Sequence, residues 1–264
     1  MGVMAIIKKG FGIATKMIPL VVILFIFNAV WNIGSIPIIK PGTASPALTA
    51  AAVIFSLLFI LASVFIQGST LGLVRDHIKS GTSELKNFIT YGLKYYLKLF
   101  GLGLLIILIA GVIALIAGAL IAVTAPANKL VLTIIASTIA VIIGGLGLYA
   151  VLLLILAPYA LVCDEIGVIA SMKRSIEKVR KSLGKVFVLL LLLILISLGI
   201  GFLIGLITGL ATIALPAAIG QVIIGIVNSA FNAYLGIVML GSLMVMYLGI
   251  EGSARPQTAA APKP

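Results

Sequence analysis

The sequence predicts an all-α polytopic membrane protein, with about six transmembrane helices arranged as three helical hairpins joined by cytoplasmic amphipathic elbow helices. Hydrophobic residues make up 62% of the chain and charged residues only 9%, whereas soluble domains carry about 25% charged residues. The apolar residues gather in long runs, and a run of about 20 residues is enough to cross a bilayer as a helix. The 28 glycines suit close helix packing in lipid.

The first predicted hairpin follows a short basic segment, 1–16. Its spans are the apolar runs 17–39 and 46–67, joined by a Pro/Gly/Ser loop. A cleavable signal peptide is the rival interpretation of the start of the chain. The first run exceeds the roughly 7–15 apolar residues of a signal peptide, which favours an uncleaved span.

Four further spans are predicted. Pro158, which has no N–H to donate, is expected to bend or end the fourth helix. The last apolar stretch is too long for one ordinary span, and Pro216 is expected to separate an outer piece from a sixth helix that is steeply tilted or broken. The four spans are 99–123, 130–157, 186–210 and 217–247. Residues 1–250 would form a single transmembrane domain, and residues 251–264 a disordered cytoplasmic tail.

The longest polar segment, 164–185, is predicted to be a basic amphipathic helix on the membrane surface. Its apolar residues recur at helical spacing on one face. Asp164 is expected to cap the first turn, and Glu177 precedes Lys181 by four residues, the favourable order for an ion pair. The apolar face consists of Ile166, Ile169, Ile176, Val179 and Leu183.

Segment 75–98 repeats this theme, with a helix predicted to start at Gly81 and Thr82. Its tyrosines suit the headgroup layer, where the ring is apolar and the hydroxyl stays wet. The basic residues of both segments are predicted to contact anionic lipid headgroups. They are Lys86, Lys94, Lys98, Lys173, Arg174, Lys178, Arg180, Lys181 and Lys185.

The distribution of Lys and Arg predicts the orientation. Sixteen of the 18 fall before the first span, between spans two and three, between spans four and five, or in the tail. Lys40 and Lys129 fall on the other side. The positive-inside rule then places both termini in the cytoplasm of a multi-pass protein of the cell membrane.

A shift of 87 residues carries Lys98 onto Lys185 and aligns two stripes of small residues. It superposes Ala110, Ala114, Gly118 and Ala122 on Ser197, Gly201, Gly205 and Gly209. Each stripe is predicted to face another helix at short distance. The chain would then contain three repeat units, 1–80, 81–163 and 164–250, each a basic surface helix followed by a helical hairpin.

Two motifs carry a resemblance to a known group. The run from Asp164 to Ser175, D-x-x-G-x-x-x-S-M-K-R-S, resembles the E-x-x-G-x-x-x-A-[LM]-[KR]-x-S pattern of a broad group of uncharacterised prokaryotic six-helix membrane proteins. These are related to the membrane domain of some glycerophosphodiester phosphodiesterases. SGTSELKNFITYGLKYYLKLF is similar to their first cytoplasmic elbow. The resemblance spans most of residues 60–210 and implies six helices with cytoplasmic elbows, but no activity.

Enzyme signatures are missing from the sequence. His77 is the single histidine and Cys163 the single cysteine, so neither a histidine-based metal cluster nor a supported Cys-His dyad can be assembled. No phosphate-binding or dinucleotide-binding glycine motif occurs. We therefore expect no enzymatic activity and no cofactor. The net charge of +12 is assigned to loops and lipid contact, not to nucleic acid.

Neutral polar residues in the first and sixth spans allow two interpretations. They are Gln221, Asn228, Ser229 and Asn232 in the sixth span and Asn28 and Asn32 in the first. They could form interhelical hydrogen bonds, each worth roughly 0.6 kcal/mol, or line a polar cavity. We thus carry two functional hypotheses. One is a scaffold or organiser that binds anionic lipid or a protein partner through its elbows, with a homo-oligomer left open. The alternative is a transporter or channel for a neutral or lipidic substrate.

Overall fold

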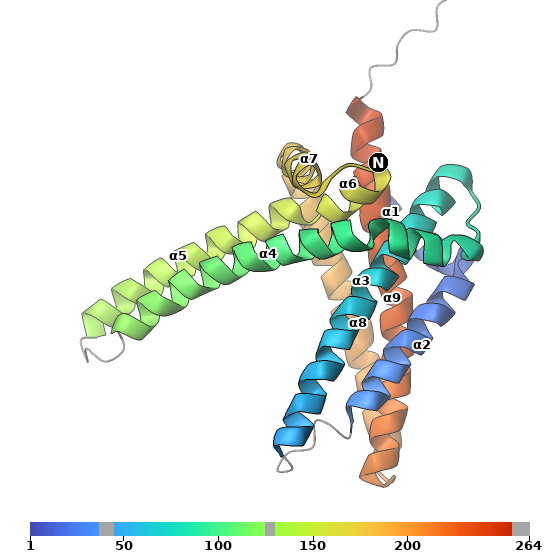
Figure 1. The fold of residues 1–264 in the computed structure, drawn as a ribbon, viewed down its shortest axis with the longest axis horizontal. Helices are drawn as coiled ribbons and strands as arrows, with labels where there is room; N and C mark the ends of the chain where they lie inside the picture. The colour runs from blue at the N-terminus through green and yellow to red at the C-terminus, as the bar shows by residue number, and fades with distance from the viewer. Residues whose placement is uncertain (37–44, 125–129, 255–264) are drawn as a thin grey trace, which may run out of the picture. The chain divides into compact units, whose positions relative to one another are not determined.

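The computed structural model describes residues 1–36, 45–124 and 130–254, and this part of the chain is helical without any strand (Figure 1). The α-helices are α1 (Val3–Lys16), α2 (Ile18–Ser35), α3 (Pro46–Ser80), α4 (Phe88–Thr124), α5 (Leu130–Leu154), α6 (Ala157–Cys163), α7 (Val168–Lys181), α8 (Leu183–Thr212) and α9 (Ala217–Ala254). A single 3₁₀ turn, η1 (Leu85–Asn87), precedes α4. The tail is predicted to be disordered from residue 251, but residues 251–254 continue α9, and residues 255–264 lie outside the described part of the chain.

Six helical stretches are long and apolar enough to cross a membrane, which confirms the all-α polytopic class. They are α2, α3, α4 with its preceding turn, α5 with α6, α8 and α9. Pro216 does precede the last helix, as predicted, but α9 continues unbroken for 38 residues. At 1.5 Å per residue it is about 57 Å long, well beyond the roughly 30 Å hydrocarbon core. The end of the predicted first span, residues 37–39, lies outside the described residues.

Two of the three predicted elbows are separate helices. Both α1 and α7 have 14 residues, and each is followed by a long apolar helix after a single linking residue. The linkers, Met17 and Ser182, leave the helical conformation with ψ of 39° and 28°. A basic residue, Lys16 or Lys181, ends each short helix, where a cation offsets the negative end of the helix dipole.

The middle elbow is built differently, and the predicted helix start at Gly81 and Thr82 is wrong. Gly81 instead ends α3 with φ of 77°, a left-handed conformation that glycine adopts without steric cost. The chain re-enters a helix only at Phe88, and α4 then runs uninterrupted to Thr124. No proline lies between those two residues, so nothing separates a surface helix from the span.

The predicted cap of the basic helix at Asp164 is also wrong. Asp164 ends α6 instead, and α7 begins at Val168, after Gly167. The connection between α6 and α7 contains Glu165 at φ of 55°, a left-handed conformation that is uncommon for a residue other than glycine. The interruption expected from Pro158 is confirmed, because α5 stops at Leu154 and proline stands in the first turn of α6, where it needs no N–H partner.

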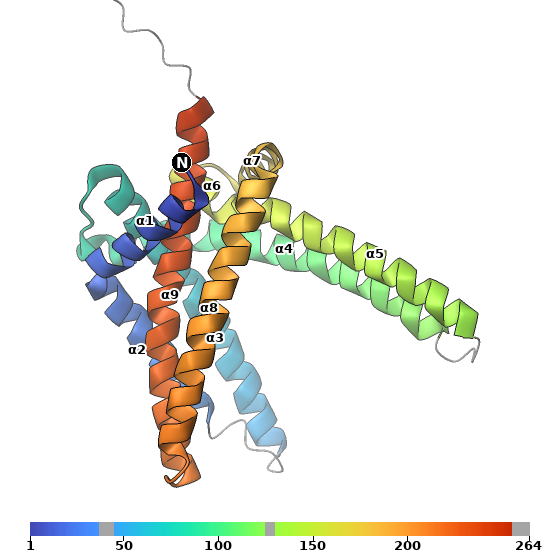
Figure 2. The ribbon, with the colours of Figure 1, turned by 180° about the vertical axis from the view of Figure 1, so that it is seen from behind.

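The chain divides into two compact units, which we describe separately. Unit 1 comprises residues 1–96 and 183–264, and unit 2 comprises residues 97–182. In unit 1, α9 is the central helix, and α1, α2, α3 and α8 all pack against it (Figure 2). Aromatic stacking joins α2 to α3, with ring centroids 3.8 Å apart for Trp31 and Phe55 and 5.6 Å for Phe27 and Phe59.

Glycines let α1 lie close against α9. A Cβ atom added at Gly10 would stand 2.0 Å from Ser242 Oγ and 2.7 Å from the Val238 carbonyl oxygen. On α9, a Cβ at Gly241 would stand 3.2 Å from the Ile13 side chain. Each helix thus has a glycine where a side chain of the other helix needs room. This close contact fixes the position of the lysines of α1.

In unit 2, α4 and α5 lie side by side as a hairpin in both views (Figures 1 and 2). A Cβ added at Gly147 would lie only 2.6 Å from the Ile113 side chain. Helix α7 packs on α5 and α6, and the hydroxyl of Ser175 donates a 2.6 Å hydrogen bond to the Leu153 carbonyl. The end of α5 is thereby tied to the middle of α7.

The predicted close packing along the stripe of small residues in α8 is wrong for most of its length. A Cβ added at Gly205 or Gly209 would meet no atom within 4 Å among the described residues. At Gly201 it would make ordinary contact with Phe231, at 3.4 Å. Spacing alone could not show this, because periodicity identifies a face but not what lies opposite it. The threefold repeat stays a prediction.

Candidate functional site: a buried arginine and a basic cavity

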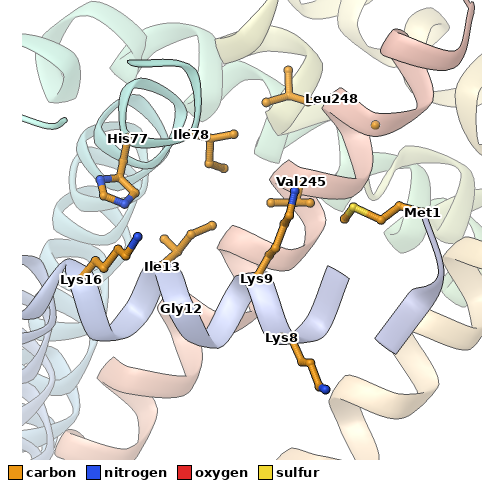
Figure 3. A pocket seen from close by; sticks show the side chains of 11 residues that line it. Met1, Lys8, Lys9, Gly12, Ile13, Lys16, His77, Ile78, Val245 and Leu248 are labelled. Atoms are coloured by element: carbon orange, nitrogen blue, oxygen red, sulfur yellow. The ribbon is translucent and has the colours of Figure 1, made fainter. Parts of the chain in front are cut away.

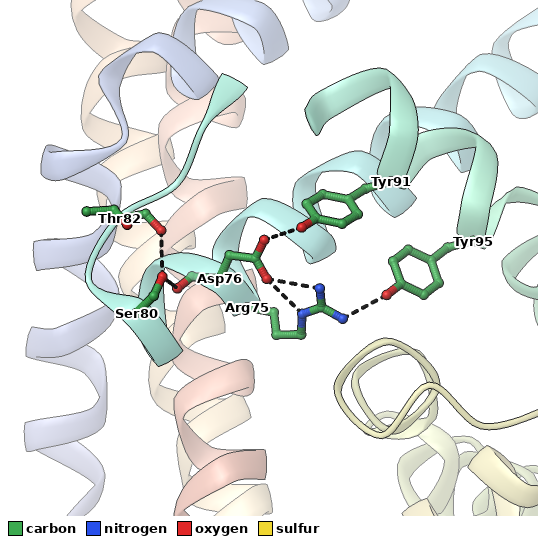
Figure 4. A network of polar contacts seen from close by, with 6 residues as sticks. All are labelled: Arg75, Asp76, Ser80, Thr82, Tyr91 and Tyr95. Carbon is green, nitrogen blue, oxygen red and sulfur yellow. Dashed lines mark hydrogen bonds and ion pairs between the residues drawn. The ribbon is translucent and has the colours of Figure 1, made fainter. Parts of the chain in front are cut away.

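The end of α3 carries a charge cluster around the buried Arg75 that the sequence patterns did not predict (Figure 4). Arg75 is 8% exposed. Its Nε and Nη2 atoms donate to Asp76 Oδ1 at 3.0 and 2.9 Å, and Nη1 donates to Tyr95 Oη at 2.7 Å. Tyr91 donates its hydroxyl to the other carboxylate oxygen of Asp76. The guanidinium and carboxylate therefore neutralise each other and hold two tyrosines of α4.

Small residues let α4 reach this cluster. A Cβ at Gly72 would lie 2.5 Å from Tyr91 Cγ, and one at Gly92 would lie 2.4 Å from Phe65 Cε2. The Arg75 guanidinium carbon lies 5.3 Å from the centre of the Tyr91 ring, within the range of a cation–π contact. With Arg75 bound to a carboxylate, a hydroxyl and a ring, the cluster serves as a clamp between α3 and the start of α4.

The sequence contained a signal for this clamp. An Arg-Asp pair ends the long apolar run of α3, and Tyr91 and Tyr95 are four residues apart, on one face of a helix. From the sequence, these tyrosines are predicted to lie in the headgroup layer. In the structure Tyr95 is buried, at 1% exposure, with its hydroxyl on Arg75.

Directly after Arg75 and Asp76 on α3, unit 1 contains a basic cavity of about 670 Å³ between α1, α3 and α9 (Figure 3). Lys9 and Lys16 of α1 and His77 of α3 border it, and Figure 3 shows both lysines extending to the same side of α1 as His77. Lys8 borders it too, although its ammonium group points to the other side of α1. The apolar wall consists of Ile13, Ile78, Val245 and Leu248.

The composition of this lining defines what the cavity can bind. The described residues that line it include no Asp or Glu. Within the described part of the chain, no carboxylate forms an ion pair with Lys9 or Lys16. A hollow with cations on one side and aliphatic walls on the other suits an anion that is attached to something apolar, because low-dielectric walls strengthen the field of the cations.

The predicted headgroup residues are exposed, with one exception. Lys178 is 6% exposed, on the buried side of α7 with Ser175 and Val179. The predicted ion pair of Glu177 with Lys181 is confirmed at 2.7 Å, and Arg174 lies 3.5 Å from Asp164. The exposed members are Lys86, Lys94, Lys98, Lys173, Arg174, Arg180, Lys181 and Lys185.

Two of the six polar residues predicted for the first and sixth spans, Asn32 and Ser229, contact each other. Asn32 of α2 donates a 2.8 Å hydrogen bond to Ser229 Oγ of α9, and Ser229 in turn donates to the Gly225 carbonyl at 2.6 Å. This is the interhelical bonding that one of the two interpretations expects. Asn28 is half-buried. Exposed positions on α9 are occupied by Gln221, Asn228 and Asn232.

The fold and these two features define the class of the protein as a multi-pass, all-α membrane protein with a basic cavity at the ends of its helices. The chain belongs to the family described as domain of unknown function DUF7847, whose family model matches residues 1–250. No curated protein and no solved structure matches the chain. The resemblance to the membrane domains of glycerophosphodiester phosphodiesterases stays a prediction.

Proposed function

We propose that this protein is a non-enzymatic scaffold or organiser of the cell membrane, which binds anionic lipid through its basic surface segments. The observation that carries the proposal is the two-sided character of α7. Lys173, Arg180 and Lys181 are exposed on this helix, whereas Ser175 and Val179 are buried. Near an anionic membrane, each such basic residue contributes about 1 kcal/mol of attraction.

The charge of α7 stays strongly positive at neutral pH. It carries five basic residues, the ones from Lys173 to Lys181, against the single carboxylate of Glu177. The hydrogen bond from the Lys181 ammonium lowers the pKa of that carboxyl from its ordinary value, so Glu177 is ionised. The exposed surface of α7 therefore carries four basic side chains against one carboxylate. The exposed ammonium groups of Lys173 and Lys181 can extend from α7 and attract the phosphates of lipid headgroups.

Removing two charges from α7 is expected to weaken the overall enrichment of anionic lipid around the protein. In nanodiscs that contain phosphatidylglycerol and phosphatidylcholine, Lys173→Gln/Lys181→Gln should carry less phosphatidylglycerol per chain than the native protein. The difference should shrink with added salt, because exposed charges are screened within about 8 Å at physiological ionic strength. Quantitative lipid mass spectrometry of the purified discs measures it.

Lys40→Gln/Lys129→Gln is the charge-matched control, since the sequence places both lysines on the opposite side of the membrane. Its lipid composition should equal that of the native protein. If the α7 variant and this control carry the same phosphatidylglycerol fraction at low salt, α7 does not recruit anionic lipid.

We also propose that both termini and the segments around Gly81 and α7 face the cytoplasm, as the 16-to-2 distribution of basic residues predicts. In a Cys163→Ala background, cysteines introduced at Gly42 and Ala127 should react with an impermeant thiol reagent added to intact cells. A cysteine at Thr82 should react only after the cells are opened. Labelling of Thr82→Cys in intact cells would reverse the orientation.

A further inference from the structure

The basic cavity of unit 1 concentrates positive charge on one wall. Lys9 and Lys16 extend from α1 toward the side on which His77 stands, and Lys16 and His77 point toward each other in Figure 3. Burial and the charge of Lys16 lower the pKa of His77, and an anion beside these groups would offset that unfavourable field. Two lysine ammonium groups and an imidazole N–H also supply hydrogen-bond donors suited to phosphate oxygens.

The aliphatic wall of the cavity indicates that the ligand also has an apolar part. Ile13, Ile78, Val245 and Leu248 are aliphatic, and they offer nothing to a free inorganic ion. The volume of about 670 Å³ lies within the roughly 300–1,000 Å³ of small-molecule sites and exceeds what one phosphate fills. An amphiphile with an anionic phosphate at one end satisfies both walls.

The cavity also lies where a lipid headgroup can reach it. Lys16 stands two residues before the start of α2, the first apolar helix. Helix α2 presents Ile18, Val22, Ile26 and Val30, between 46% and 61% exposed, at every fourth position. Such a stripe on a spanning helix faces hydrocarbon, so the lipid acyl region begins next to the lysine end of the cavity.

We propose that this cavity binds one anionic phospholipid, with its phosphate held by Lys9, Lys16 and His77 and its glycerol end against the aliphatic wall. This deepens the proposed function, on which it rests. It assigns a single, saturable lipid site to the cavity, distinct from the diffuse lipid attraction of α7. Basic pockets between membrane helices take phosphate headgroups in this manner.

The test counts lipid bound by the full-length protein in detergent. Native mass spectrometry during titration with phosphatidylglycerol should show one lipid bound tightly per chain, and phosphatidylcholine should bind much more weakly. Lys9→Gln/Lys16→Gln should weaken the tight phosphatidylglycerol site by about tenfold or more, because each lysine contributes attraction for the phosphate. Lys173→Gln/Lys181→Gln removes the same charge from α7 and should leave the tight site unchanged.

Two further arms keep the result interpretable. Lys9→Arg/Lys16→Arg retains both charges and should keep the tight site, which separates loss of charge from loss of folding. Inorganic phosphate should compete only weakly. Complete displacement of the lipid by low millimolar phosphate, or equal affinity for phosphatidylcholine, would overturn the assignment to an anionic phospholipid. If Lys9→Gln/Lys16→Gln binds phosphatidylglycerol as tightly as the native protein does, the site is not this cavity. Failure of the α7 experiment in nanodiscs would leave this site standing, so the two proposals fail separately.

Discussion

Replacing Arg75 by Met is expected to lower the free energy of unfolding of the protein by about 3–5 kcal/mol, the usual cost of removing one partner from a buried ion pair. The change strands Asp76, whose side chain is only 26% exposed. It also removes the hydrogen bond from Arg75 to the Tyr95 hydroxyl and the contact of the guanidinium with the Tyr91 ring. The loss should fall toward the lower end of that range, because water still reaches part of the carboxylate.

The measurement is the thermal or denaturant unfolding midpoint in detergent. Tyr95→Phe, which removes one hydroxyl from the cluster, should cost about 1 kcal/mol. Arg75→Met/Asp76→Asn should recover much of the loss, since a stranded charge is no longer present. If Arg75→Met and Tyr95→Phe both unfold at the same midpoint as the native protein, the clamp contributes nothing to stability.

Gly10→Ala is expected to destabilise the docking of α1 by about 1–3 kcal/mol, the typical cost of overpacking. The added methyl group would lie 2.7 Å from the carbonyl oxygen of Val238, and a backbone atom can move away only if α1 and α9 separate. The thermal midpoint should fall, and proteolysis within residues 1–16 should become faster.

Gly12→Ala is the matched control on the same helix. A Cβ at Gly12 meets nothing within 4 Å, and alanine favours a helix over glycine by roughly 0.5–1 kcal/mol. The two substitutions should therefore move the midpoint in opposite directions. A rise in both would mean that α1 does not lie against α9 in the membrane, and the cavity would lose one of its walls.

Local sequence patterns located some features correctly and misplaced others. The break at Pro158 follows from the missing N–H of proline, a local property. The helix starts assigned to Gly81 and Asp164 were wrong, since both residues end the preceding helix in the structure. A residue that favours a helix terminus does not say which of two neighbouring helices it terminates, and that choice depends on where the chain packs next.

The sequence by itself determined the class of this protein, because hydropathy and run length decide how many helices can cross a bilayer. It also determined where the basic segments lie along the chain. Only the tertiary structure decided which charges meet. Lys16 and His77 border the same cavity although 61 residues separate them in the sequence. Val245, which lines the other wall, lies still further along the chain. Helical spacing gives each residue a face, but the close glycine contacts of α1 with α9 and of α3 with α4 select the faces that come together, and those contacts belong to the fold.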